Sequence, residues 1–217
     1  MINRRVALLA GLSFLSLPGP SGKAVAQGGA PAGNQVSAQD RADLSRIEGY
    51  LNGVRSMRSR FVQTAPNGDI TQGAALMQRP GKMRFQYDPP TPFLLVANYG
   101  TLFFHDASLR QTSNIPLSRT PLGILLADQT ILSGDVTVTK FVRLPGQYQL
   151  SLVRTASPGE GTLTLVLADN PLTLRQWIVV DQQGRQTRVT LTNLEVGARV
   201  DPKQFEYNNP MPSTGGG

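Results

Sequence analysis

The spacing of apolar residues first follows the period of a helix. Four of them recur at intervals of three and four residues: Leu44, Ile47, Leu51 and Val54. This spacing places them along one side of an amphipathic helix. Ser37 precedes the stretch and Asp40 follows three residues later, an imperfect capping box at which such a helix begins. The pattern therefore predicts one helix in this part of the chain.

After this helix the period changes to two, as in residues 82–87, where apolar and polar residues alternate. Short runs of this kind predict strands near residues 60–64, 70–79, 82–87, 93–98, 101–105, 109–112, 136–144, 148–154, 161–167, 174–181 and 186–194. Turn dipeptides separate many of them: Asn67-Gly68, Pro80-Gly81, Tyr99-Gly100, Pro145-Gly146, Pro158-Gly159 and Gln183-Gly184. Ten or eleven short strands indicate a mainly β fold, in which a meandering antiparallel sheet curls into a barrel or half-barrel. This pattern excludes a parallel α/β fold.

Residues 116–128 interrupt the series of strands. They contain the run Pro121-Leu122-Gly123-Ile124-Leu125-Leu126-Ala127, which is too apolar for an exposed loop and favours a short helix. A short apolar helix between the strands of a sheet has to pack against the interior of the fold. It is either a plug that belongs to the core or a lid over a cavity.

The N-terminus has the features of a secretory signal. Arg4 and Arg5 precede an apolar run over residues 6–17, which is too short to span a bilayer, and Ala24-Val25-Ala26 has the small-x-small pattern of a cleavage site. We therefore expect a signal peptide over residues 1–26 and export to the periplasm, with the general and the twin-arginine routes both open. A flexible leader over 27–36, one domain over 37–210 and a flexible tail over 211–217 would follow.

Composition narrows the possible classes of protein. The chain has no cysteine, which excludes disulfides and a lipid anchor on an N-terminal cysteine, so we expect the mature protein to be free in solution. Lys and Arg number 21 against 14 Asp and Glu. Three of the basic residues lie in the predicted signal, and the others are scattered singly through strand-like segments. A nucleic-acid binder would cluster them on one face, so no nucleic-acid partner is expected.

No group of residues points to catalysis. His105 lies beside Asp106 and could suggest a catalytic pair, but the chain has no nucleophile elbow, no zinc-protease motif and no phosphate-binding glycine loop. A lone histidine also makes a poor metal site. Trp177 is interpreted as part of the core or of a cavity wall. We therefore expect neither an enzyme nor a cofactor nor a metal.

Several short motifs follow one another along the chain. They are Phe61-x-Gln63, Gly73, Arg79-Pro80-Gly81-Lys82-Met83-Arg84-Phe85, Tyr87-x-Pro89, Leu95-Val96, Gly100-x-Leu102-x-Phe104, Gln111, Pro121-Leu122 and Asp201-Pro202-Lys203-x-Phe205-x-Tyr207-x-x-Pro210. In this order they resemble the signature of the LolA family of lipoprotein carriers, in which the last motif belongs to the closing strand. The resemblance covers about residues 40–210.

The resemblance implies an unclosed antiparallel barrel of about eleven strands, with an N-terminal helix and short lid helices over an apolar cavity. It implies a periplasmic chaperone that receives the acyl chains of lipoproteins from an inner-membrane ABC-type releasing complex and passes them to an outer-membrane acceptor. We expect a monomer. Two other functions on the same scaffold stay open: a binding module for another lipid or hydrophobic ligand, and a regulatory sensor.

Arg79 is the main candidate for a functional side chain. It has the strand parity of Ala75 and Met77, so it points toward the interior if those two do. The resemblance implies that it holds the lid shut through hydrogen bonds to the lid backbone, which incoming lipid breaks. The cavity is expected to be lined by Met77, Met83, Phe85, Tyr87, Leu94, Val96, Leu102, Phe104, Leu122, Ile124, Leu125 and Leu126.

Overall fold

The computed structural model describes residues 37–207, all of which lie in one compact unit. The predicted signal peptide, leader and tail therefore lie outside the described residues. So do residues 208–210, the last positions of the predicted domain.

Helix α1 (Ala38–Gly53) begins where the capping pattern predicts. Ser37 is its N-cap, and its hydroxyl accepts a hydrogen bond from the Asp40 amide at 3.0 Å. Ile47 and Leu51 are buried in the core. No helix within residues 37–207 has both the length and the apolar character needed to cross a bilayer.

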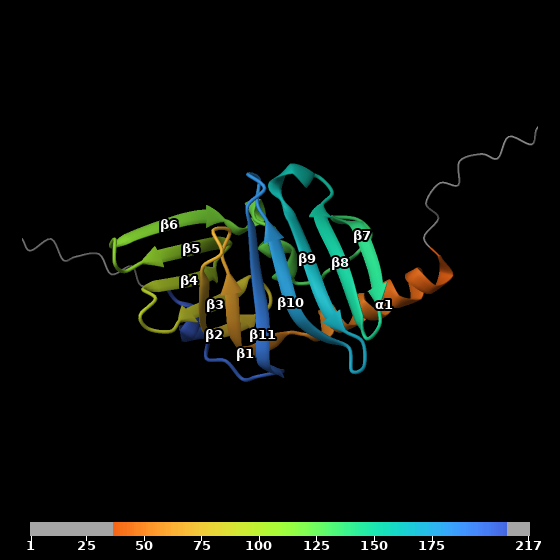
Figure 1. The fold of residues 1–217 in the computed structure, drawn as a ribbon, viewed down its shortest axis with the longest axis horizontal. Coiled ribbons are helices and arrows are strands. Elements are labelled where there is room, and N and C mark those ends of the chain that lie inside the picture. Colours follow the sequence, from red (N-terminus) through yellow and green to blue (C-terminus); the bar gives the residue numbers. More distant parts are fainter. Residues whose placement is uncertain (1–36, 208–217) are drawn as a thin grey trace, which may run out of the picture. The chain divides into compact units, whose positions relative to one another are not determined.

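Eleven strands form one antiparallel sheet in the order β6-β5-β4-β3-β2-β1-β11-β10-β9-β8-β7 (Figure 1). They are β1 (Ser56–Thr64), β2 (Ile70–Gln78), β3 (Lys82–Tyr87), β4 (Phe93–Asn98), β5 (Thr101–Asp106), β6 (Gln111–Pro116), β7 (Val136–Leu144), β8 (Gln147–Arg154), β9 (Thr162–Ala168), β10 (Thr173–Val180) and β11 (Gln186–Val196). A 3₁₀ turn, η2 (Pro158–Glu160), joins β8 to β9. The edge strands β6 and β7 do not pair with each other. The prediction of a mainly β, unclosed antiparallel fold is confirmed.

Strand β6 starts later than the sequence pattern predicts. The pattern placed a strand at residues 109–112, whereas β6 runs from Gln111 to Pro116. The Asp106 carboxylate accepts hydrogen bonds from the amides of Ser108 and Leu109, which fixes a turn over these residues. The local turn overrides the short apolar-polar alternation.

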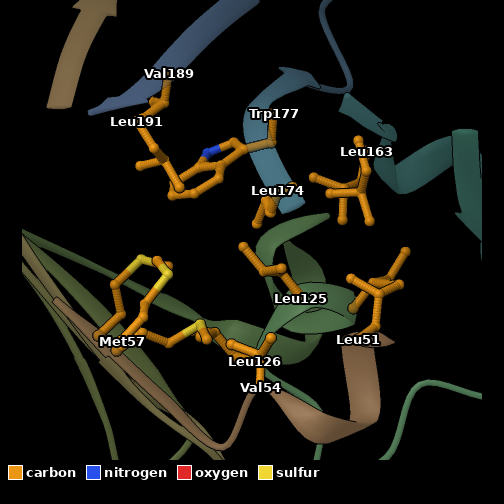
Figure 2. Packing of buried hydrophobic residues seen from close by; sticks show 14 of the residues in the cluster. Leu51, Val54, Met57, Leu125, Leu126, Leu163, Leu174, Trp177, Val189 and Leu191 are labelled. Atoms are coloured by element: carbon orange, nitrogen blue, oxygen red, sulfur yellow. The ribbon is translucent and has the colours of Figure 1, made fainter. Parts of the chain in front are cut away.

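The connection from edge strand β6 to edge strand β7, residues 117–135, has to pass across the sheet. We call it the crossover segment. It contains a 3₁₀ turn, η1 (Leu117–Arg119), and helix α2 (Leu122–Leu125). Figure 2 shows Leu125 and Leu126 pointing into the core below Trp177 and Leu174 of β10. The sheet face that carries Phe61, Phe85 and Trp177 is called the inner face below.

Within residues 201–207, the described part of the last motif forms no strand, contrary to the prediction from the resemblance. Residues Pro202–Phe205 form a 3₁₀ turn, η3, because the Asp201 carboxylate accepts the Lys203 amide and Pro202 takes the first position of the turn. Phe205 is fully buried, and its carbonyl accepts a hydrogen bond from Asn98 at 3.0 Å. This segment therefore covers the outer face of β3 and β4.

Candidate functional site

An apolar cavity of about 200 Å³ opens on the inner face between two groups of strands. Its walls come from β1, β3, β4, β5, β10 and β11, and helix α2 contributes one residue. It is lined by Gln63, Met83, Phe85, Tyr87, Leu95, Phe104, Leu122, Trp177, Val179, Thr187 and Val189. The set contains no charged side chain.

Three aromatic rings that line the cavity, Phe85, Tyr87 and Trp177, belong to one packed cluster with the core residue Phe61. The ring of Phe61 lies 4.5 Å from that of Phe85 and 5.2 Å from that of Tyr87, the latter edge to face. Phe85 in turn meets Trp177 edge to face at 5.9 Å. Rings in these arrangements stabilise each other beyond the area that they bury. They give the cavity a closely packed apolar wall.

The structure places five of the expected lining residues on this cavity: Met83, Phe85, Tyr87, Phe104 and Leu122. Trp177, interpreted from the sequence as core or cavity wall, is both buried and part of the lining. Five others lie in the core cluster without lining the cavity: Met77, Leu102, Ile124, Leu125 and Leu126. Helix α2 is therefore mainly a plug, while Leu122 at its start faces the cavity as a lid would.

Leu94 and Val96 lie on the opposite sheet face, which corrects the placement predicted for them. Leu94 pairs with Gln86 and Val96 with Arg84, whereas their neighbour Leu95 pairs with Phe85 on the inner face. Residues 93–97 are apolar throughout, so alternation carries no information about which residues face inward. Val96 is buried because the C-terminal segment covers its face of the sheet.

Arg79 points inward as its parity predicts and is 5% exposed. Its Nη1 donates to the carbonyl of Leu51 at 2.9 Å, and its Nε has no hydrogen-bond partner among residues 37–207. Burial and, secondly, the neighbouring Arg55 lower the pKa of Arg79 to about 10. Leu51 belongs to the last turn of α1, whose carbonyls have no partner within the helix and form the negative end of its dipole.

The bond from Arg79 thus goes to helix α1, not to the backbone of residues 121–127 as the resemblance implies. The contact to that backbone is made nearby, where the amide of Gly81 donates to the carbonyl of Leu126 at 2.8 Å. The β2–β3 turn therefore holds both covering helices, α1 through Arg79 and α2 through Gly81.

Polar side chains of α1 fasten the crossover segment. The side-chain amide of Asn52 bonds both the carbonyl and the amide of Thr130, at 3.1 and 2.7 Å. The Glu48 carboxylate accepts the amide of Leu132 at 2.7 Å. We call these contacts the clasp. Sequence reasoning missed Asn52 and Glu48, because polar residues on the solvent side of an amphipathic helix give no signal of such a role.

The other end of α1 is held by ion pairs. Arg143 of β7 pairs with Asp43 and with Asp40, the latter at 2.9 Å. The hydrogen bond from Arg143 is the main reason that the pKa of Asp43 lies below its ordinary value. Arg46 pairs with Asp169 in the β9–β10 turn. Helix α1 is therefore anchored at its start by charges and at its end by Arg79 and the clasp.

His105 and Asp106 do not form a catalytic pair through a hydrogen bond. His105 Nδ1 bonds the hydroxyl of Thr112 at 3.0 Å, while Asp106 accepts hydrogen bonds from Ser108 and Leu109 in the following turn. Both side chains have local structural partners.

Comparison with known proteins identifies relatives over most of the chain. Residues 52–208 match the family model described as "Outer membrane lipoprotein carrier protein LolA". The chain is 28% identical over 184 residues to an outer-membrane lipoprotein carrier protein of Methylococcus capsulatus, which covers 81% of this chain and 88% of that protein. A protein of the same name from Pseudomonas aeruginosa is 24% identical over 182 residues, or 80% and 86% of the two chains.

Among solved structures, the chain is similar to a LolA superfamily protein from Nitrosomonas europaea. That likeness has a TM-score of 0.44 and 11% sequence identity, and it covers 75% of this chain and 97% of the other.

Proposed function

Because the chain belongs to the LolA family of outer membrane lipoprotein carrier proteins, we propose that it is a periplasmic chaperone for lipoproteins. In this proposal it takes up the acyl chains of lipoproteins released from the inner membrane by an ABC-type complex and carries them to an outer-membrane acceptor. Residues 1–26 would direct export and be removed, and residues 37–210 would form the carrier domain, acting as a monomer.

The observation that carries the proposal is the apolar cavity on the inner face, roofed in part by helix α2. Transfer of an acyl chain from water into such a cavity is favourable by about 0.8 kcal/mol per methylene. This driving force depends on apolar area and not on the identity of the attached peptide. A carrier of many different lipoproteins needs this kind of site.

The volume of the cavity indicates that uptake requires movement. An apolar cavity of about 150 Å³ accommodates benzene, so about 200 Å³ has room for only part of a long acyl chain. The covering helices are held by a few hydrogen bonds from Arg79, Gly81 and the clasp. The bonds between neutral groups each contribute on the order of 1 kcal/mol and the bond from the charged Arg79 about 1.5–3 kcal/mol, so each is comparable to the gain from burying about one to four methylenes. Entry of a chain can therefore open the cover.

Cross-linking from two adjacent leucines tests the proposal. A photoreactive phenylalanine analogue at Leu95 faces the cavity, while the same analogue at Leu94 lies on the opposite face of β4. After expression in the periplasm, lipoproteins should be captured from position 95 and not from position 94. Equal capture from both positions would contradict the proposed site. Capture of a small lipid in place of lipoproteins would favour a binding module for another hydrophobic ligand.

A further inference from the structure

One end of the cavity is polar, and the carrier function as such gives it no role. Gln63 and Thr187 line the cavity at this end, and Thr71 lies directly opposite Gln63 in the register of β1 and β2. Thr187 lies two residues from Val189, which pairs with Gln63, and is therefore its diagonal neighbour on the same face. We call Gln63, Thr71 and Thr187 the polar row.

Tyr87 holds Gln63 in position. The Tyr87 hydroxyl donates to Oε1 of Gln63 at 2.9 Å. Gly73 lies on β2 between the strands of these two residues, and it pairs with Tyr87 on one side and with Phe61 on the other. A Cβ at Gly73 would lie 2.8 Å from the ring of Phe61 and 2.1 Å from the carbonyl oxygen of Gln86. A side chain at Gly73 would therefore displace the Phe61 ring or the β3 backbone next to Tyr87.

This arrangement leaves two side chains of the cavity lining, Gln63 and Thr187, with hydrogen-bond donors that are unpaired among the described residues. The Tyr87 contact uses the oxygen of the Gln63 amide, and Nε2 of Gln63 donates no hydrogen bond within residues 37–207. The hydroxyl of Thr71 is buried and has no partner in the same part of the chain. The Thr187 hydroxyl makes no hydrogen bond there either, and it lines the cavity. Unpaired donors on the wall of an apolar cavity favour a ligand that brings an acceptor.

We infer that the polar row binds the ester or amide carbonyl at the head of an acyl chain, with Gln63 and Thr187 as donors and Tyr87 as the residue that positions Gln63. The inference rests on the proposed carrier function and names the part of the cargo that this end of the site recognises. The donors are neutral, and the lining includes no cation. A carboxylate or a phosphate would lose its hydration without compensation. A neutral carbonyl loses far less.

The inference also gives the bound chain a direction. Met83, Phe85 and Tyr87 line the cavity along β3, and at ~3.3 Å per residue the distance from Tyr87 to Met83 is about 13 Å. The carbonyl would lie at the Tyr87 end and the tail would run toward Met83 and Leu122 of α2. The peptide of a lipoprotein would then leave the cavity beside the β1–β2 turn, away from Arg79 and helix α1.

Chain-matched ligands test the inference. The dissociation constants of N-methyldecanamide, methyl decanoate, dodecane and decanoate are measured by displacement of the fluorescent dye anilinonaphthalene sulfonate. In Gln63→Met, which keeps the length of the side chain and removes its donors, the affinity for the amide or the ester should fall about 2- to 10-fold relative to dodecane. Binding of dodecane should not change, and decanoate should gain nothing from Gln63.

Two further variants complete the design. Gln72→Met makes the same change on the exposed outer face of β2 and should leave all the ratios unchanged. Thr187→Val should lower the same ratio without breaking a side-chain hydrogen bond of the described residues, so the test does not depend on the folding of Gln63→Met. A loss confined to the amide or to the ester supports the inference and identifies which linkage is bound.

Negative results would distinguish failure of the inferred polar row from failure of the proposed carrier function. Unchanged ratios in both Gln63→Met and Thr187→Val, with all ligands still bound, would overturn the role of the polar row and leave the carrier function intact. Failure of the wild-type protein to bind dodecane and the decanoyl compounds alike would overturn both.

Discussion

Replacement of Arg79 by leucine should produce a carrier that loads but does not release. In the closed structure the bond from the guanidinium to the Leu51 carbonyl is a hydrogen bond to a charged group and contributes about 1.5–3 kcal/mol. Burial and, secondly, the like charge of Arg55 lower the Arg79 pKa from 12.5 to about 10, which corresponds to a cost of about 3 kcal/mol for the charged form. The two nearly cancel, so the empty closed form gains little from Arg79. Its free energy of unfolding should stay the same or rise slightly in Arg79→Leu.

In the loaded form, Arg79 contributes differently to the free energy. An acyl chain that separates α1 from β2 removes the Leu51 carbonyl and leaves the guanidinium facing an apolar interior without its partner. A leucine at this position avoids that cost. The variant should therefore favour the loaded form by about 1.5–3 kcal/mol, which is roughly a 10- to 150-fold slower release if uptake is unaffected.

The assay follows transfer of a fluorescent triacylated peptide from the purified protein to an outer-membrane acceptor. Arg84→Leu is the matched control, because Arg84 lies on the outer face of β3 and bonds Gln86 and Gln204. The control should transfer normally while Arg79→Leu retains its cargo. Transfer by Arg79→Leu at the wild-type rate, or an equal defect in both variants, would refute the reasoning.

Three other predictions concern the parts that hold the cover in place. Gly123→Ala should destabilise the protein by about 1–3 kcal/mol, because the new Cβ would lie 2.2 Å from Nη2 of Arg154 and 2.6 Å from the Leu117 carbonyl oxygen. Gly49→Ala in α1 is the matched control, because no atom lies within 4 Å of its new Cβ, and it should stabilise the protein by about 1 kcal/mol. A similar change of melting temperature in the two glycine variants would contradict this packing. Asn52→Ala leaves the buried Thr130 amide without its acceptor and should speed amide hydrogen exchange over residues 126–132, whereas unchanged exchange would show that the clasp does not hold this segment. Because the folded-state pKa of Asp43 lies below the ordinary value of 3.8, its ion pair stabilises the fold above that pH and is lost as pH falls through the folded value. Asp43→Asn should therefore flatten the decline of the unfolding free energy below about pH 4, and an unaltered pH profile would show that the pair contributes nothing.

The sequence by itself determines most elements of this fold, because their signals are local. The start of β6 is an exception, since the turn at Asp106 sets it. The cap at Ser37 fixes the start of α1, and strict alternation over residues 82–87 fixes both the strand and its inner face. The parity of Arg79 with Met77 gives its direction for the same reason. A side chain in a regular strand has only two faces to choose from.

Only the tertiary structure decides what those side chains meet. Leu94 and Leu95 are the same residue type in an apolar run, and the assignment of one to each face depends on the register with β3 and on the C-terminal segment that covers the outer face. The partner of Arg79 is a carbonyl 28 residues away in a helix end that no motif marks. The polar row is assembled from β1, β2 and β11, and Tyr87 of β3 bonds Gln63 across β2. Such contacts depend on how distant segments pack, and a pattern with a period of two or four residues carries no record of them.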